Sequence, residues 1–220
     1  MTAPGPLPIL YHCRDARSLR CLWAAEEAGV DIDLHLLPFP PRAFAPEYKE
    51  VNPLKTVPGW IEDGVLLTES AAICERIAQG TPLEVMPDEA DYWPYRNWLH
   101  RSDATLTFPL AIMIRYTRVE PPERRLAQAV DDYKAFFAGR ARSIETALAD
   151  GREWLCSGRF TIADICVGYA AFLARTLDAE DALGEATVAW LDRCVARPAF
   201  GRARVADGPA QLTRRSRPSQ

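Results

Sequence analysis

Residues 52–73 read NPLKTVPGWIEDGVLLTESAAI, and this stretch decides the fold of the 220-residue chain. Residues 60–61 and 65–67 are short apolar runs on either side of Glu62-Asp63-Gly64. Asp-Gly between such runs is a strong signal of a β-hairpin. Thr68-Glu69-Ser70 then opens a helix with apolar periodicity. A strand, a turn, a second strand and a polar helix start therefore follow one another directly.

The start of this predicted helix suits an amino-acid-like ligand. A helix N-terminus attracts anions through its unpaired N–H groups and its dipole. Ser70 can donate to a ligand carboxylate, and Glu69 can accept from a ligand ammonium. If the Val57–Pro58 bond is cis, the backbone of Val57 can pair with an extended peptide. Ser70 could instead only cap the helix and Pro58 only end a loop, but the order of the features favours a peptide-binding site.

The same stretch resembles the glutathione-binding half of the cytosolic glutathione transferases. In that family a Val before a cis-Pro holds the cysteinyl backbone of glutathione. A Glu/Gln/Asp-Ser pair at a helix start holds its γ-glutamyl end. The resemblance implies these roles for Val57, Pro58, Glu69 and Ser70.

The first part of the chain predicts a thioredoxin-like domain over residues 1–79. Residues 7–13 read as a buried strand, residues 18–28 as a helix that Gly29 ends, and residues 31–39 as a second strand. Strand, helix and strand form a βαβ unit with parallel strands. The hairpin and the helix after it complete the βαβ-ββα arrangement that the family resemblance implies.

The rest of the chain predicts an all-helical C-terminal domain over residues 91–204, after a linker at 80–90. Residues 91–116 and 123–148 carry long apolar stripes. A third helix opens at the FTIADI run, where Thr161 is the predicted N-cap and Asp164 completes a capping box. This run resembles the start of the central C-terminal helix of glutathione transferases. The basic tail at 205–220 is predicted to be disordered.

Composition indicates a soluble globular protein without a nucleic-acid or membrane partner. Apolar residues make up 48% of the chain and charged residues 25%, and the formal net charge is -4. The N-terminus lacks the basic and long apolar regions of a secretory signal. The cysteines show no C-x-x-C or metal-ligand spacing, which predicts a reduced, cytoplasmic and metal-free protein. The six cysteines are Cys13, Cys21, Cys74, Cys156, Cys166 and Cys194.

Glutathione chemistry needs a thiolate, and a free thiol has a pKa of about 8.5. The group that lowers this pKa is expected at the start of the first helix. Counted back from Gly29, the Ser of zeta-like members or the Cys of omega-like members falls on Asp15. The Ser of theta-like members falls on Ala16, and the Cys of beta-like members on Arg17. None of the usual residues is at its usual place. The resemblance is therefore to a bacterial-type transferase, and its class within the family stays open.

Ser18 is the predicted donor to the thiolate, with Arg17 assisting. Ser18 could instead be the helix N-cap, and Arg17 a solvated side chain or a dimer contact. Tyr11 and Cys13 are further candidates. Their simpler roles are core packing for Tyr11 and a buried structural thiol for Cys13.

The resemblance also implies residues for the other ends of the site. Thr56, Lys55 or Arg42 would hold the glycyl carboxylate of glutathione. Asp103 lies where some members send an acid across the dimer interface to the γ-glutamyl ammonium. The second substrate would sit between the domains, in a pocket formed by Phe108, Met113 and Tyr116. Such an aromatic stripe on a helix can also be plain core.

The predicted function is conjugation of the glutathione thiolate to small electrophiles, with glutathione as co-substrate. Such a reaction serves detoxification, and the protein is expected to be a cytoplasmic homodimer. Two alternatives stay open. One is a glutathione-binding module with little transferase activity, suggested by Asp15 and Ala16 at expected catalytic positions. The other is a glutathione-dependent thiol–disulfide or peroxidase-type enzyme that works through Cys13.

Overall fold

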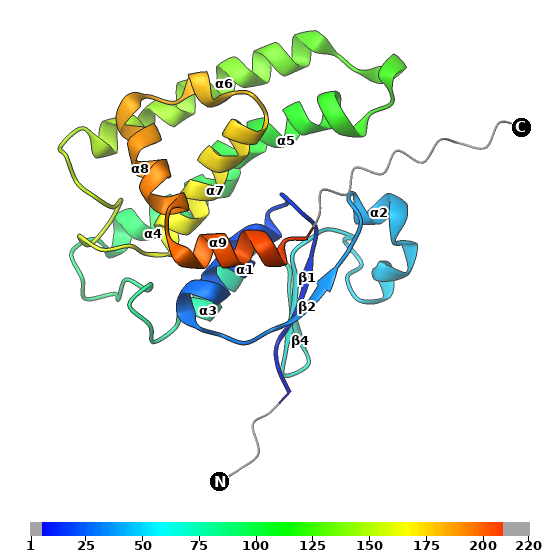
Figure 1. The fold of residues 1–220 in the computed structure, drawn as a ribbon, viewed down its shortest axis with the longest axis horizontal. Coiled ribbons are helices and arrows are strands. Elements are labelled where there is room, and N and C mark those ends of the chain that lie inside the picture. The colour runs from blue at the N-terminus through cyan, green and yellow to red at the C-terminus, as the bar shows by residue number, and fades with distance from the viewer. Residues whose placement is uncertain (1–5, 209–220) are drawn as a thin grey trace, which may run out of the picture.

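The computed structural model describes residues 6–208, in which a four-stranded sheet is followed by a set of helices (Figure 1). The sheet order is β2-β1-β3-β4. Strand β1 (Ile9–His12) pairs in parallel with β2 (Asp33–Leu36) and antiparallel with β3 (Gly59–Glu62). Strand β3 forms the predicted hairpin with β4 (Val65–Leu67). The thioredoxin-like arrangement is therefore confirmed.

Helix α1 (Ser18–Ala28) has the predicted bounds, and it ends at Gly29 in the left-handed conformation with φ of 67°. Helix α3 (Ser70–Ala78) begins directly after Glu69. Between β2 and β3 lie helix α2 (Pro41–Phe44) and a 3₁₀ turn (Pro46–Glu50). Strand β2 is shorter than residues 31–39 because the prolines that follow it have no N–H to donate to a sheet.

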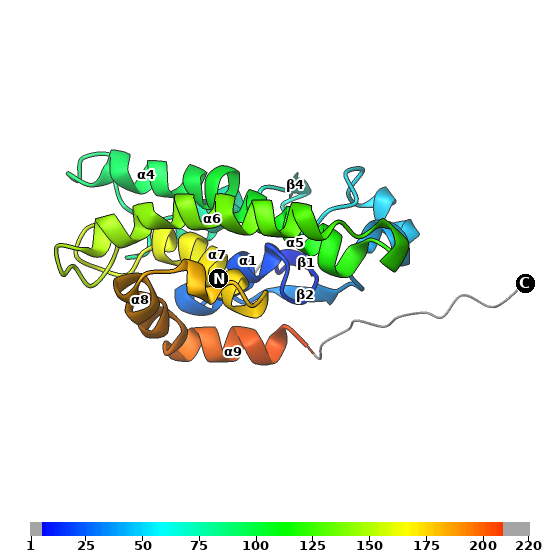
Figure 2. The same cartoon turned by 90° about the horizontal axis from the view of Figure 1, so that it is seen from above.

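The C-terminal part is helical, as predicted, and Figure 2 shows α7 between the α4–α6 layer and α9. The sequence did not predict two π-helical turns, one of which interrupts the first long helix while the other ends it. Pro198 begins the last helix, because proline fits the first turn of a helix. The helices are α4 (Tyr92–Arg101), the π turn Ser102–Thr107, α5 (Phe108–Ile114), the π turn Arg115–Val119, a 3₁₀ turn (Pro122–Arg124), α6 (Ala127–Leu148), α7 (Ile162–Thr176), a 3₁₀ turn (Glu180–Ala182), α8 (Glu185–Val195) and α9 (Pro198–Ala206).

The predicted capping box at the start of α7 is confirmed. The Thr161 hydroxyl accepts from the N–H of Ala163 at 3.2 Å, and the Asp164 carboxylate accepts from the N–H of Thr161 at 3.0 Å. Asp164 also accepts from the indole N–H of Trp190 at 3.0 Å. One buried carboxylate thus caps α7 and ties it to α8.

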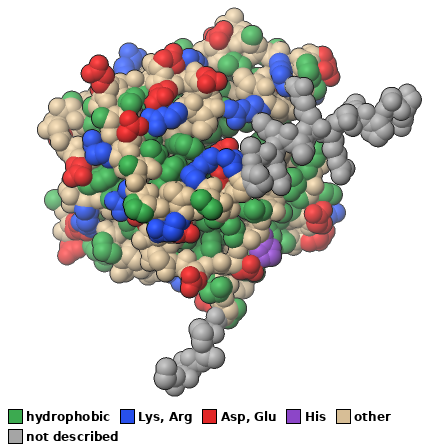
Figure 3. All heavy atoms as spheres, in the orientation of Figure 1, with side chains coloured by type: hydrophobic (Ala, Val, Ile, Leu, Met, Phe, Trp, Pro, Cys, Tyr) green, Lys and Arg blue, Asp and Glu red, His purple; other side chains and the backbone are tan. Residues whose placement is uncertain are grey.

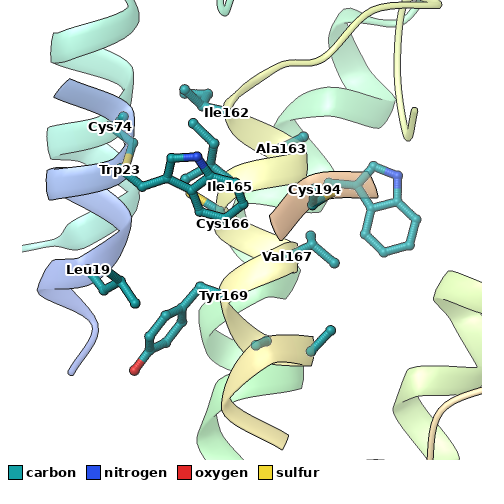
Figure 4. Close-up of a cluster of buried hydrophobic side chains, with 14 of the residues drawn as sticks. Leu19, Trp23, Cys74, Ile162, Ala163, Ile165, Cys166, Val167, Tyr169 and Cys194 are labelled. Atoms are coloured by element: carbon teal, nitrogen blue, oxygen red, sulfur yellow. The ribbon is translucent and has the colours of Figure 1, made fainter. Parts of the chain in front are cut away.

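A single buried apolar cluster connects the sheet-side helices to the C-terminal helices (Figure 4). Trp23 of α1 lies at its centre, with its ring centroid 4.8 Å from that of Phe200. Gly168 of α7 faces the Trp23 ring, and a Cβ there would lie in ordinary van der Waals contact with it at 3.6 Å. All six cysteines are buried and free, as predicted for small hydrophobic side chains.

Residues 80–90 contain no helix or strand, whereas the division of the chain at residues 79 and 91 stays a prediction. Helix α9 continues to Ala206 and Asp207 is buried, so the helical part reaches beyond residue 204. The predicted disorder of the tail at 205–220 is wrong for residues 205 and 206, which belong to α9, whereas residues 209–220 lie outside the described residues. None of the described helices has the length and apolarity needed to span a bilayer. Positive and negative side chains alternate on the face in Figure 3, without a large patch of one sign.

Candidate functional site

Ser70 is the first residue of α3, and its side chain is almost fully buried. Its hydroxyl oxygen accepts a hydrogen bond from Nη1 of Arg20 at 2.9 Å. Glu69 precedes it in an extended conformation and is exposed. The first N–H groups of a helix have no partner within the helix. The start of α3 therefore presents unpaired N–H groups, one hydroxyl and one carboxylate side by side.

The loop before β3 is shaped by a cis proline bond and by a buried asparagine. The Val57–Pro58 bond, whose isomer the sequence left open, is cis. Asn52, which is fully buried, holds the loop because its side-chain amide donates to the carbonyl of Thr56 at 2.9 Å. Lys55 and Thr56 are exposed, and Lys55 has a positive φ of 55°. Their side chains are accessible to a ligand.

Ser18 lies inside the protein. Its side chain is fully buried, and its hydroxyl lies 2.8 Å from Nδ1 of His12. The same oxygen accepts from the N–H of Cys13 at 3.3 Å. Arg17, and not Ser18, occupies the N-cap position of α1, without a side-chain cap. The Ser18 hydroxyl is therefore not presented to a ligand in this structure.

Arg17 and Asp103 form an ion pair between α1 and the π turn Ser102–Thr107. Nε of Arg17 donates to Asp103 at 2.6 Å, and both side chains keep about a third of their surface exposed (35% and 29%). Burial raises the pKa of the Asp103 carboxyl, but nearby Arg20 and Arg17 outweigh it and hold that pKa below its usual range. Asp103 thus reaches α1 of its own chain.

Sequence reasoning missed Arg20, which connects these groups. It is fully buried in α1, and its Nη1 lies 2.9 Å from the Ser70 hydroxyl and 3.5 Å from the Asp103 carboxylate. A signal was available, because Arg20 follows Arg17 by three residues and so lies on the same side of the helix. The sequence alone could not say that this charged residue is buried.

The other two candidates for thiol activation, Cys13 and Tyr11, are buried or packed against other side chains. Burial raises the pKa of the Cys13 thiol to about 12, which keeps it protonated and weakly nucleophilic. Tyr11 is half-buried and packs on Tyr48 at 5.1 Å between ring centroids. Asp15 has a positive φ of 57° and accepts from Arg204 at 2.6 Å. Arg42 is exposed on α2.

The predicted second-substrate residues differ in exposure. Phe108 is 45% exposed at the start of α5, with its ring edge-on to Tyr133, and Tyr116 is half-buried. Met113 is buried in the core.

A shallow hollow of about 250 Å³ lies elsewhere, over the β3–β4 hairpin and Arg76, and none of the predicted site residues lines it. Among residues 6–208, no group of three His, Cys, Asp or Glu side chains could hold a metal ion.

Comparisons with known proteins identify the family of the N-terminal part and the fold. Residues 16–79 match the model of the glutathione S-transferase N-terminal domain. Glutathione S-transferase 3 of Schizosaccharomyces pombe is 32% identical over 101 residues, a match that covers 44% of this chain and 42% of that relative. The chain therefore matches less than half the length of this curated relative.

Solved structures match over almost the whole chain. The glutathione transferase URE2P8 from Phanerochaete chrysosporium, solved with oxidized glutathione, has a TM-score of 0.79 at 20% identity and covers 94% of this chain and 97% of its own. The nitrogen regulation fragment of the yeast prion protein Ure2p has a TM-score of 0.79 at 23% identity, with 93% and 99% covered. The resemblance to the glutathione transferases is confirmed, and the described residues 6–208 have their fold.

Proposed function

We propose that this chain conjugates glutathione to small electrophiles. Its residues 16–79 match the glutathione S-transferase N-terminal domain, and its fold is that of glutathione transferases. The observation that carries the proposal is the cluster of Ser70 at the start of α3, Arg17 at the N-cap of α1 and Asp103 on the π turn Ser102–Thr107. Arg17 pairs with Asp103, and Arg20 contacts both Ser70 and Asp103. These residues supply a hydroxyl donor, an anionic acceptor and a cation within one site. Such a set matches the carboxylate, ammonium and thiolate of glutathione.

Each end of the tripeptide has a proposed partner. The hydroxyl of Ser70 and the first N–H groups of α3 bind the γ-glutamyl carboxylate. Asp103 and the exposed Glu69 bind the γ-glutamyl ammonium. The backbone of Val57 pairs with the cysteinyl residue, and Lys55 or Thr56 binds the glycyl carboxylate.

Arg17 is the proposed group that stabilises the thiolate. Its Nε is used by Asp103, and neither of its terminal nitrogens bonds another residue in the described part of the chain. Lowering a thiol pKa by about two units requires about 2.7 kcal/mol. A hydrogen bond to a charged group contributes about 1.5–3 kcal/mol. One guanidinium can therefore supply most of the shift, and Ser18, fully buried beside His12, is not needed for it.

The reaction then proceeds in two steps. The thiol of glutathione loses its proton to water, and the thiolate sulfur attacks an electrophilic carbon. A carbon–sulfur bond forms as the leaving group departs with its electron pair. The exposed Phe108 and the half-buried Tyr116 are proposed to contact the electrophile. The protein is proposed to be a cytoplasmic homodimer that acts in detoxification.

The test is the ultraviolet absorbance of the thiolate of bound glutathione, followed against pH. The parent is expected to give an apparent pKa of about 6–7, below the free value of about 8.5. Arg17→Met should return the value toward that of free glutathione, whereas Ser18→Ala should change it little. An unshifted pKa in the parent, with glutathione bound, would contradict a transferase function.

A glutathione-binding regulatory module is the second candidate. It is favoured by the Asp103 carboxylate, which lies 2.6 Å from Nε of Arg17 and offsets part of the positive charge that would stabilise a thiolate. The similar yeast fragment is described as one of nitrogen regulation. This candidate predicts glutathione binding without turnover of an aryl halide. The high pKa of the buried Cys13 thiol weighs against the third alternative, a thiol–disulfide enzyme.

A further inference from the structure

The loop of residues 13–17 joins β1 to α1 and carries Arg17, the proposed partner of the thiolate. Its backbone includes Asp15 at a φ of 57°, a left-handed conformation that is unfavourable for residues other than glycine. Such a conformation persists only where surrounding contacts hold it. The contacts that hold this loop therefore decide where Arg17 lies.

Asp207 supplies two of these contacts from the other end of the described chain. Helix α9 packs along α1 (Figure 1), and Asp207, whose side chain is fully buried, follows it at the end of β1. Oδ1 of Asp207 accepts from the N–H of Asp15 at 3.2 Å and lies 2.7 Å from Nε2 of His12. One carboxylate oxygen thus joins the last residue of β1 to the middle of the loop.

His12 extends this connection to the start of α1. A carboxylate only accepts hydrogen bonds, so Nε2 of His12 donates its proton to Asp207. In a neutral imidazole the other nitrogen then accepts, and the Ser18 hydroxyl lies 2.8 Å from it. Serine, histidine and aspartate in this order also occur in hydrolases, but all three side chains are fully buried here, so a substrate does not reach Ser18. The chain of hydrogen bonds instead holds both ends of the loop.

Two further side chains hold Asp15 itself. The hydroxyl of Tyr169, on α7, donates to the Asp15 carbonyl at 2.9 Å. Nη1 of Arg204, on α9, donates to the Asp15 carboxylate at 2.6 Å and also to Asp207. The N–H and the carbonyl of Asp15 are therefore both bonded by residues of the helical part. Because Arg17 follows only two residues later, a displacement at Asp15 is passed to it through the backbone.

We infer that Asp207 is a positioning residue for thiol activation, which holds the loop of residues 13–17 so that the guanidinium of Arg17 faces the sulfur of glutathione. This inference rests on the proposed function and deepens it, because the ionisation of the bound thiol then depends on a residue that never touches the ligand. The proposed partners of the γ-glutamyl and glycyl ends lie on α3, the π turn and the loop before β3. Loss of Asp207 should therefore change the thiol more than the binding of the rest of the tripeptide.

The experiment compares the parent with Asp207→Ala in two measurements. The first follows the ultraviolet absorbance of the thiolate of bound glutathione against pH. Its apparent pKa should rise by about 1 in the variant, which is a tenfold smaller ionisation constant. Removing a negative charge would by itself lower the pKa of a nearby thiol, so a rise reports a displaced guanidinium. An unshifted or lowered pKa would overturn the inference.

The second measurement is the Kd for S-methylglutathione, which has no thiol to ionise. Calorimetry should show a change of less than about twofold between the parent and Asp207→Ala. A loss of affinity for this thioether as large as the loss in the ionisation constant would mean that Asp207 supports the whole site, and it would overturn a role confined to the thiol.

A double-mutant cycle with Arg17→Met shows whether Asp207 acts through Arg17. If it does, Asp207→Ala raises the apparent pKa of the thiol little further once Arg17 is replaced. The same rise with and without Arg17 would overturn the inference. If Asp207→Ala does not fold, Arg204→Met decides, because Arg204 is partly exposed and bonds both Asp15 and Asp207. This variant should also raise the pKa, and an unshifted value would overturn the inference.

Glu145→Ala is the matched control. Glu145, on α6, is also a carboxylate that holds the backbone of another segment, since it accepts from the N–H groups of Ala186 at 3.1 Å and Thr187 at 2.8 Å on α8. Its loss should lower the free energy of unfolding and leave the thiolate pKa unchanged. An equal rise of the pKa in both variants would overturn the positioning role. If the parent itself does not lower the pKa of bound glutathione, the proposed function fails, whereas a lowered value that is equal in the parent and in Asp207→Ala refutes only the inference.

Discussion

Nε2 of His12 lies 2.7 Å from the carboxylate of Asp207, and both side chains are fully buried. The contact joins the end of β1 to the residue that follows α9. The other ring nitrogen of His12 faces the Ser18 hydroxyl at 2.8 Å. Asp207 also accepts from the N–H of Asp15 at 3.2 Å. The end of the described chain thus holds the loop that leads into α1.

Asp207→Ala should therefore destabilise the protein strongly. The substitution leaves His12 and the N–H of Asp15 without their partner, and breaking a buried pair typically costs about 3–5 kcal/mol. The measurement is urea unfolding at neutral pH. Asp33→Ala is the control, because Asp33 pairs with His35 at 3.0 Å on the surface, where such a pair contributes about 0–1 kcal/mol. Equal losses in the two variants would contradict the role of the buried contact.

Gly59→Ala should lower both stability and glutathione affinity. A Cβ at Gly59 would overlap the Tyr48 hydroxyl, which donates to the carbonyl of Thr56 at 3.2 Å and so helps to hold the loop before β3. Overpacking of this kind costs about 1–3 kcal/mol. Unfolding in urea and calorimetry with glutathione measure the two effects. Because Tyr48→Phe removes the overlapping atom, the double variant should recover part of the loss of Gly59→Ala, and a purely additive result would refute the overlap.

The fall of the free energy of unfolding at acid pH should depend on Asp103. Its pKa is held below the unfolded value, so the folded state binds fewer protons and gains stability above that unfolded value. The gain is lost as the pH falls through about 4 and below. Asp103→Asn should flatten this part of the curve. Free energies of unfolding at pH 5, 4 and 3 measure it, and parallel curves for parent and variant would argue against the charge interaction with Arg17 and Arg20.

Phe108 and Met113 should respond differently to truncation. Phe108→Ala removes a ring that is 45% exposed, so stability should change by less than about 1 kcal/mol while the KM for an apolar electrophile rises. Met113→Ala empties a core position and should cost about 2–5 kcal/mol. Thermal unfolding and steady-state kinetics separate the two effects. A KM unchanged by Phe108→Ala would remove this residue from the second-substrate pocket.

Local signals in the sequence were enough for much of the fold. The bounds of α1, the hairpin turn at Asp63-Gly64 and the capping box of Thr161 and Asp164 each depend on residues that are close in the chain. Turn chemistry and capping operate over a few residues, so a sequence displays them directly. The family resemblance then supplied the order of the elements.

The candidate site was less predictable, because its partners are far apart in the chain. Ser18 offers a hydroxyl at the start of α1, and only the fold shows that His12 uses it. Arg20 meets Ser70 and Thr107 from 50 and 87 residues away. No pattern of period 3.6 distinguishes a buried, hydrogen-bonded arginine from a solvated one. Long-range contacts, rather than spacing, decide which of these side chains reach a ligand.

The π turn Ser102–Thr107 also has a consequence for sequence alignment. An i to i+5 turn encloses one residue more than the i to i+4 turn of a regular α-helix. A relative with an unbroken helix here would therefore need a one-residue gap in this turn to keep equivalent side chains on equivalent faces. Without the gap, every position from Phe108 to Ile114 would be compared with a residue about 100° away around the helix axis. An alignment that treats this helix as continuous would assign the role of Phe108 to the wrong residue.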